Sequence, residues 1–243
     1  ATGASVSDVI EIIVYDVFSV GNFFNRTDSD SRYVNVDGDT MTGDLTIGDA
    51  SASDRKILFD GNAQDFHIGL DDSTDSLTIG LGSTLGTTSH MVIDENGQIT
   101  KPLQPAFLVQ MSALQSDFAI NGGVTVLFDS EIFDQNADYN TSTYTFTAPV
   151  TGRYQFNVQV RFNGADTAAN YYQVYIVSSN RNYVFTFDPN FTGDLTYHSA
   201  SLAVVADMDA SDTAYVQVNQ NGGSQQTDIS HGGDSYFSGC LLA

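Results

Sequence analysis

Basic residues are scarce in this sequence: 8 lysines and arginines stand against 30 aspartates and glutamates, for a formal net charge of −22. Binding to nucleic acid needs clustered cations that contact phosphates, so this balance excludes a nucleic-acid partner. The acidity favours solubility and resistance to non-specific association. Salt or bound divalent cations would reduce the self-repulsion of such a chain.

Cysteine and long apolar runs are scarce as well. The one cysteine, Cys240, excludes a disulfide within the chain. It lies in the apolar run "YFSGCLLA", where we expect a small buried hydrophobe rather than a nucleophile. The most apolar early stretch, "VIEIIVYDVF", contains Glu11 and Asp16 and is too short to cross a bilayer. We therefore expect no membrane insertion.

The pattern that is present is β-rich and divides the chain into three zones. Residues 1–36 join the strand-like "SDVIEIIVYDVF" to the polar "NFFNRTDSDSRYV", which predicts the end of an upstream anchoring domain and a connector, either a short helix or an extended linker. Residues 37–104 alternate short apolar pieces with turn clusters. Residues 105–243 repeat longer strand patterns with turn signals between them.

The middle zone has the pattern of a ribbon that needs partners. The "DG" of "FDGN" and the "NG" of "DENGQIT" predict hairpins, since both central residues of a type I′ turn need positive φ. Pieces such as "KILFDGN" and "DFHIGL" are too short to bury a hydrophobic face alone. They become stable when several chains wrap around a shared axis. We therefore expect residues 37–104 to form a trimeric β shaft.

The third zone shows strict alternation of apolar and polar residues. In "RYQFNVQVRF" every second residue is apolar, which is the period of a β-strand with one buried face. Seven or more strands at this spacing, without a helical period between them, predict an all-β sandwich or jelly roll. The residues expected on the buried face are Tyr154, Phe156, Val158, Val160 and Phe162.

The start of the middle zone resembles a known kind of sequence. "SRYVNVDGDTMTGDLTIG", residues 31–48, resembles a segment common in phage tail fibres and related virion fibres, in which "GDTMTGDL" marks the start of the shaft. "FDGNAQDFHIGLDDSTDSLTIGLG" is similar to shaft sequence of marine phage structural proteins. The resemblance implies a structural protein on the virion surface, attached to other virion proteins through its N-terminal side.

The third zone resembles the globular domain shared by complement C1q and tumour necrosis factor relatives. The similarity lies in "PAFLVQM", in the ending "DSYFSGCLLA", and above all in "YNTSTYTFTAPVTGRYQFNVQV". Cys240 stands where the family usually has Phe. The resemblance implies a jelly-roll head of ten strands that forms tight homotrimers and binds ligands without being an enzyme. We expect Phe156, Phe237 and Gly239 in the trimer core, because a glycine within a strand suggests close approach of a neighbour, here another subunit.

The loops of the head predict a receptor-binding end. Consecutive antiparallel strands run to opposite ends, so the loops 134–142, 163–170, 188–198 and 220–234 are expected at the tip, away from the shaft. Their amides and carboxylates can bond sugar hydroxyls and their aromatic rings can stack on sugars, which suits a host-surface glycan. The predicted receptor-binding residues are Asn163, Asp166, Asn170, Tyr171, Phe191, Tyr197, Asn221, Asp228 and His231.

The acidic residues raise two further possibilities besides receptor binding, a calcium site and a glycosidase site. Asp228 and Asp234 could hold calcium together with loop carbonyls, since calcium takes oxygen ligands; a solvated acidic loop is the alternative. The acidic run "DDSTDS", residues 71–76, has the carboxylates of a glycosidase but no pocket-building context. We assign no catalytic residue and no cofactor apart from that possible calcium.

The sequence therefore predicts a virion fibre protein whose trimeric head binds a host cell-surface receptor, a glycan or a protein, for adsorption. One alternative is a capsid fibre or decoration protein with a mainly structural role. A fibre-borne glycan hydrolase is the alternative from another functional class.

Overall fold

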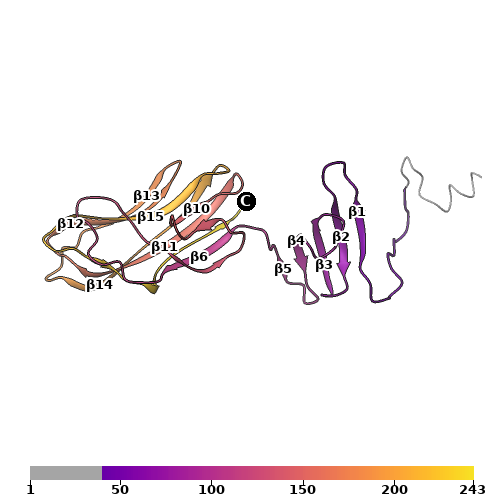
Figure 1. Cartoon of the computed structure of the whole chain (residues 1–243), viewed down its shortest axis with the longest axis horizontal. Helices are drawn as coiled ribbons and strands as arrows, with labels where there is room; N and C mark the ends of the chain where they lie inside the picture. Colours follow the sequence, from indigo (N-terminus) through magenta and orange to yellow (C-terminus); the bar gives the residue numbers. More distant parts are fainter. Residues whose placement is uncertain (1–39) are drawn as a thin grey trace, which may run out of the picture. The chain divides into compact units, whose positions relative to one another are not determined.

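The computed structural model describes residues 40–243 of the chain. Within the described part, residues 49–243 form one compact unit. The predicted anchoring domain and connector over residues 1–36 lie outside the described residues. Every element in the described part is a β-strand, so the all-β fold class is confirmed (Figure 1). No helix there could span a membrane.

The first five strands form one antiparallel sheet. Neighbouring strands along the chain are neighbours in the sheet, in the order β1-β2-β3-β4-β5 (Figure 1). Each strand has two to six residues, as expected for short pieces separated by turns. Their bounds are β1 (Arg55–Phe59), β2 (Phe66–Asp71), β3 (Ser76–Leu81), β4 (Ser89–Ile93) and β5 (Ile99–Thr100).

Both predicted hairpins form, but their turns differ from the predicted type. A type I′ turn needs two positive φ angles, whereas only Gly97, with a φ of 80°, is left-handed among the four "DG" and "NG" residues. The carboxylate of Asp94 accepts hydrogen bonds from the backbone N–H groups of Asn96 and Gln98. The turn is therefore organised by an aspartate that precedes it, a common role of this residue.

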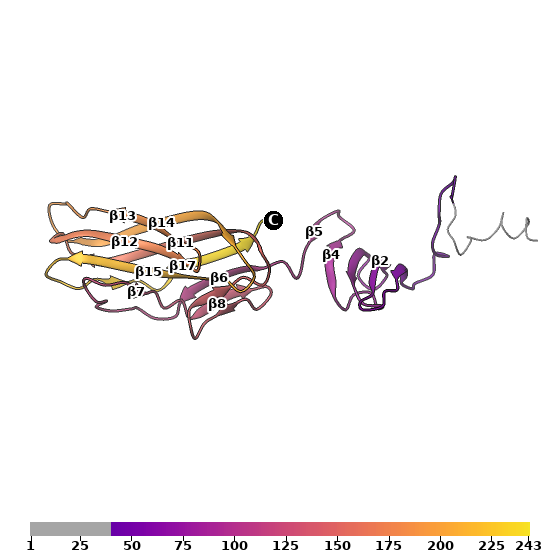
Figure 2. The same cartoon turned by 90° about the horizontal axis from the view of Figure 1, so that it is seen from above.

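Residues 106–243 fold into a jelly roll of two packed sheets. One sheet has the order β13-β12-β15-β10-β9 with β7 paired to β15, and the other has the order β14-β11-β17-β6-β8 with β16 paired to β11 (Figure 2). The bounds are β6 (Ala106–Met111), β7 (Val124–Thr125), β8 (Ser130–Asp134), β9 (Tyr139–Asn140), β10 (Thr145–Thr147), β11 (Gly152–Ala165), β12 (Ala169–Ser178), β13 (Asn182–Phe187), β14 (Leu195–Met208), β15 (Thr213–Gly222), β16 (Asp228–Ile229) and β17 (Gly232–Leu241).

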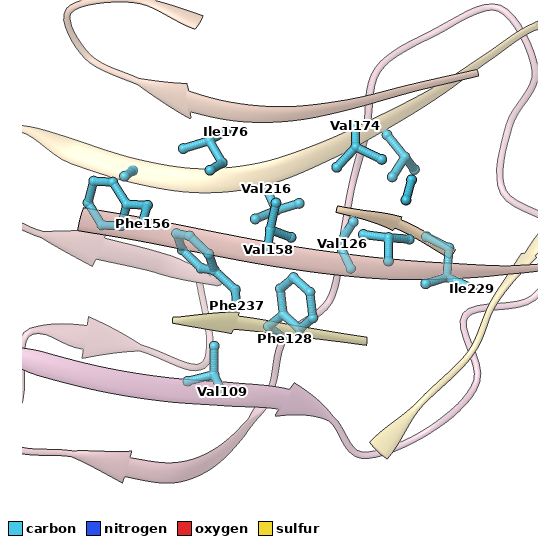
Figure 3. Packing of buried hydrophobic residues seen from close by; sticks show 14 of the residues in the cluster. Val109, Val126, Phe128, Phe156, Val158, Val174, Ile176, Val216, Ile229 and Phe237 are labelled. Carbon is cyan, nitrogen blue, oxygen red and sulfur yellow. The ribbon is translucent and has the colours of Figure 1, made fainter. Parts of the chain in front are cut away.

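The core lies between these two sheets and follows the predicted alternation. The five apolar residues predicted on the inner face of β11, from Tyr154 to Phe162, are all buried, while the residues between them are half-buried on the outer face. Figure 3 shows Phe156 and Val158 of β11 facing Val216 and Ile176 of the other sheet. The interior is aromatic-rich, and such rings contribute much of the buried apolar area.

The predicted trimer-core residues are wrong, because they belong to the core of the single chain. Phe156 and Phe237 are completely buried within one copy, with ring centroids 5.7 Å apart (Figure 3). A Cβ added to Gly239 would lie 2.6 Å from Phe107 Cε1 and 2.7 Å from Phe156 Cδ1. The close neighbours that require glycine are therefore two rings of the same chain, not another subunit.

The two ends of the jelly roll are set by the strand register. Along β11 and β14, Gly152 pairs with Met208 at one end and Ala165 pairs with Leu195 at the other. We call the end with Gly152, where the last strand also finishes, the base, and the end with Ala165 the tip. Segments 163–170, 188–198 and 220–234 lie at the tip, as predicted, and the turns 149–153, 178–182 and 206–212 lie at the base.

Segment 134–142 was predicted at the tip, but its first part lies at the base. Asp134 pairs with Phe107 of β6, and the backbone N–H of Gln135 donates to the carbonyl of Ala106 at 2.9 Å. The error arises because β9 has only two residues and leaves no alternating pattern in the sequence. Through β9, the chain crosses between base and tip once more than the sequence pattern predicts. A segment that precedes β9 is therefore assigned to the wrong end.

Candidate functional site

A hollow of about 590 Å³ opens at the tip of the jelly roll. Four separate parts of the chain form it: the end of β11, the start of β14, the segment that leads into β16, and the segment that follows β6. Polar side chains dominate its walls. The lining residues are Asp117, Asn163, Gly164, Asp194, Leu195, Thr196, Tyr197, Gln225, Gln226 and Asp228.

Tyr197 provides an exposed aromatic face in this hollow. It lies on the outer face of β14, and 62% of its surface is exposed. The guanidinium carbon of Arg161 lies 4.7 Å from the centre of its ring, a cation–π contact. Arg161 is itself held by Asp234 at 2.5 Å and donates to the hydroxyl of Ser230 at 2.8 Å. The ring is therefore exposed and yet fixed in position.

Hydrogen-bond acceptors line the same hollow as the ring. Oδ1 of Asp194 accepts from the N–H and the hydroxyl of Thr167, each at 2.9 Å, and Oδ1 of Asp228 accepts from the N–H of Asp117 at 2.8 Å. The described residues provide no hydrogen bond to Oδ2 of either carboxylate. The Oδ1 atom of Asn163 is also buried without a partner in this part of the chain. Ligand hydroxyl groups could satisfy these acceptors.

Asp117, which lines the hollow, has a left-handed backbone conformation. Its φ is 50°, which aspartate tolerates better than most residues. Besides the bond from its N–H to Asp228, its carbonyl accepts from Nε2 of Gln226 at 2.7 Å. These contacts tie two segments of the tip together. Asp117 was missed from the sequence, although the rule of alternating ends, applied to the strand "AFLVQM", places the next segment at the tip.

Asp166 was predicted as a receptor contact, but it is buried and its carboxylate ties two segments of the tip together. The carboxylate accepts hydrogen bonds from the backbone N–H groups of Ala168, Ser224 and Gln225, at 2.7, 2.6 and 2.9 Å. We call this set of hydrogen bonds the Asp166 latch. Burial alone would raise the pKa of Asp166, but these bonds outweigh it and lower the pKa below the ordinary value. Asp166 therefore holds the segment that carries Gln225 against the end of β11.

The other predicted receptor residues do not form one surface with Tyr197. Asn170 and Asn221 bond each other at 2.9 Å beside Tyr171, which lies on the outer face of the opposite sheet. Phe191 is exposed in the loop before β14, and His231 is exposed before β17. Of the nine predicted residues, the hollow brings together three, Asn163, Tyr197 and Asp228.

The two predicted calcium ligands are engaged separately. Asp228 receives the N–H of Asp117, whereas Asp234 forms the ion pair with Arg161 and accepts from the hydroxyl of Ser230 at 3.0 Å. Across residues 40–243, no group of three or more His, Cys, Asp or Glu side chains could hold a metal ion. Such a site needs several free oxygen ligands, and Asp234 is already neutralised by an arginine.

The acidic turn at residues 71–76 has a structural role. The carboxylate of Asp71 is buried and accepts from the N–H and the hydroxyl of Ser73, at 3.1 and 2.6 Å. It closes the turn between β2 and β3, which is a frequent use of aspartate. The hollow at the tip, by contrast, combines a fixed aromatic face with outward-facing acceptors, which is suited to binding a polyhydroxylated ligand.

Comparisons with known proteins concern the jelly roll. A search of curated proteins found no match. Among solved structures, the globular domain of zebrafish complement 1qA is similar at 19% identity with a TM-score of 0.45, covering 58% of this chain and 98% of that one. Murine APRIL is similar at 12% identity with a TM-score of 0.42, covering 57% and 99%. The family model of the C1q domain matches residues 106–242, more than half of the chain. The chain therefore belongs to the C1q domain family.

Proposed function

We propose that this chain is a virion fibre protein whose trimeric C1q head binds a host cell-surface glycan through the hollow at its tip. Domains of the C1q family are typically non-enzymatic binding domains and typically form trimers. The virion location is supported by the fibre-like sequence of residues 31–48 and by the shaft-like sequence that follows it. The N-terminal side would then attach to other virion proteins.

The observation that carries the proposal is the exposed ring of Tyr197 beside unsatisfied acceptors. Arg161 lies over the ring of Tyr197 and holds it in place, while 62% of the surface of Tyr197 stays exposed. A sugar ring can stack on it while its hydroxyls donate to Asp194 and Asp228. Each site would be weak, and three sites on one trimer would raise the avidity by orders of magnitude.

The outer face of the sheet with β11 and β17 supports association of copies. Its centre is half-buried, contains amide and hydroxyl side chains, and contains no carboxylate. In a chain with a net charge of −22, copies meet with least repulsion through a face whose centre contains no carboxylate and whose flanking carboxylates, Asp207 and Asp234, are paired with arginines. We assign the trimer contact to this face, in place of Phe156, Phe237 and Gly239. Its central residues are Leu108, Gln155, Asn157, Gln159, Tyr236, Ser238 and Cys240.

Labelling of Cys240 tests this contact. Cys240 is half-buried in a single copy, and its pairing with Gln155 and Ala106 places it on the outer face of the sheet. We expect a maleimide to react with it at least ten times more slowly in the native assembly than in the unfolded chain, because a neighbouring copy covers it. Equally fast labelling of a protein that sediments as a trimer would place the contact on another face.

Replacement of Tyr197 by alanine tests the receptor site. We expect binding of the trimer to host cells to fall at least ten-fold, which corresponds to about 1.4 kcal/mol, because the stacking face is lost. The matched control is Tyr171→Ala, which removes a tyrosine at the same end but on the other sheet. The measurement is adsorption of the labelled protein to host cells, with competition by purified host polysaccharide.

Comparison of the Tyr197→Ala and Tyr171→Ala variants shows which results would contradict the proposal. If Tyr197→Ala binds host cells as the unchanged protein does, the hollow is not the receptor site. If neither tyrosine matters and the protein is found on capsids, the structural role of a capsid fibre or decoration protein replaces the adsorption role. Release of fragments from the polysaccharide would indicate a hydrolase.

A further inference from the structure

One face of the β1–β5 sheet is apolar and uncovered. In the strand register, Ile57, Ile68, Ile79 and Met91 form a continuous row across four strands. A second row joins Phe59, Phe66 and Leu81, and a third joins Leu70, Leu77, Ile93 and Ile99. Paired residues point to the same side of a sheet, so these eleven side chains share one face.

The opposite face is already covered by its own chain. The segment 82–88 lies over it: Nδ1 of His67 lies 2.9 Å from the carbonyl oxygen of Gly82, and Lys56 donates to the carbonyl of Ser83. His67 is fully buried there, and Leu85 of the covering segment is buried too. An antiparallel sheet normally buries its apolar face and leaves the polar face to water. Here the polar face is covered and the apolar one is exposed.

The apolar face is large enough for a stable interface. Seven of its residues are among the exposed large hydrophobics, with between 37% and 60% of their surface accessible. If these seven side chains leave roughly half of about 150–200 Å² exposed and the four half-buried ones about a fifth, the face offers on the order of 700 Å², close to one partner's share of a standard interface. A patch of this size is rarely left exposed on a soluble protein.

The charge on this face favours a copy of the same chain as its occupant. The chain carries 30 acidic residues, yet none of the residues in the three rows is acidic. Arg55 extends the third row, opposite Leu70, and its charge is paired with Asp49. Two copies can therefore bring these faces together without burying a carboxylate, which would cost several kcal/mol per ion.

The link to the head brings the copies close to one another. Five residues, 101–105, connect β5 to β6, and five extended residues span at most about 17 Å. In a trimer of heads, the three sheets would thus be tethered within a short distance of one another. A short tether corresponds to an effective concentration in the millimolar range, which makes even a weak contact form.

We propose that the apolar faces of three β1–β5 sheets pack against one another around the trimer axis, so that the side chains of the three rows form a shared core. The proposal rests on the homotrimer of the proposed function and identifies the surface that the shaft uses. It would also give the apolar face of this sheet the second layer that such a face requires. The polar face, with segment 82–88, then forms the outside.

Single cysteines on adjacent residues of β1 test the proposal. Ile57 and Leu58 are similarly exposed in one copy, 45% and 39%, but they lie on opposite faces of the sheet. In full-length protein with Cys240→Ser, we expect the thiol of Ile57→Cys to react with maleimide at least ten times more slowly than that of Leu58→Cys. Ile68→Cys, in the same row as Ile57, should form a disulfide-linked dimer on mild oxidation, while Leu58→Cys should stay unlinked.

Sedimentation of the same samples separates the outcomes. A trimer in which Ile57→Cys and Leu58→Cys react equally fast, or in which Ile68→Cys does not cross-link, overturns the shared core while the head trimer stands. A monomer overturns the homotrimer itself, and a dimer with a protected Ile57→Cys overturns the threefold arrangement. Ile79→Cys repeats the cross-linking test in the third strand of the row, in case Ile68→Cys disturbs folding.

Discussion

Replacing Phe237 by alanine is expected to lower the free energy of unfolding by about 3–5 kcal/mol, the usual cost of deleting a large ring from a packed core. The side chain is fully buried, and its ring centroid lies 5.1 Å from that of Phe107 and 5.7 Å from that of Phe156. These rings come from three neighbouring strands of one sheet, β11, β17 and β6, so the cavity left behind cannot be filled by a single neighbour. Urea unfolding at fixed protein concentration measures the loss.

The matched control is Tyr215→Ala on β15. Tyr215 is half-buried on the outer face of the opposite sheet, away from the face assigned to the trimer contact. Its removal should cost about 1 kcal/mol or less, as expected for an outward-facing side chain. Equal losses in the two variants would mean that Phe237 does not lie in a core of the single chain. Loss of assembly with an unchanged fold would restore its predicted place between subunits.

Alternation made the strands and the core of the head predictable. A strand that buries one face must place every second residue inside, so β11 could be assigned inner and outer residues from its sequence alone. The position of Gly239 was less informative. A glycine in a strand shows that something approaches closely, but the sequence cannot tell whether the neighbour belongs to the same chain, as Phe107 does, or to another.

The candidate site was only partly predictable for a different reason. The hollow joins Asp117, Asn163, Asp194 and Gln225, which lie in four segments far apart in the sequence. Their meeting depends on the register of long strands and on latches such as Asp166, and neither leaves a local pattern. The composition of the tip loops did indicate a polar surface with aromatic residues. It could not separate Tyr197 from Tyr171, because the sheet to which each belongs follows from the pairing of strands.

The Asp166 latch leads to the second large effect. We expect Asp166→Ala to lose about 3 kcal/mol of stability, because it leaves the N–H groups of Ser224 and Gln225 without their charged acceptor, and Asp166→Asn to lose less. Since Gln225 lines the hollow, host binding should weaken in the alanine variant as well. Hydrogen exchange should show the amides of Ser224 and Gln225 opening at least ten times more often.

The latch should also depend on pH in a defined direction. The pKa of Asp166 is lower in the folded protein than the ordinary value of about 3.9 in an unfolded chain. Its stabilising contribution is therefore fully present above about pH 4 and is lost as the pH falls through the lowered folded value. The stability difference between the unchanged protein and Asp166→Asn should shrink over that acidic interval and stay constant between pH 5 and 8.

Asp188→Ala serves as the control for this prediction. Asp188 is an exposed aspartate at the same end, and its carboxylate accepts from the N–H of Asn190 within its own loop. Its removal should leave the exchange of Ser224 and Gln225 unchanged, since it ties no second segment down. If those amides stay protected in Asp166→Ala, the segment is held by other contacts, such as the bonds of Gln226 to the carbonyls of Asp117 and Phe118. The geometry of the hollow would then not depend on the buried carboxylate.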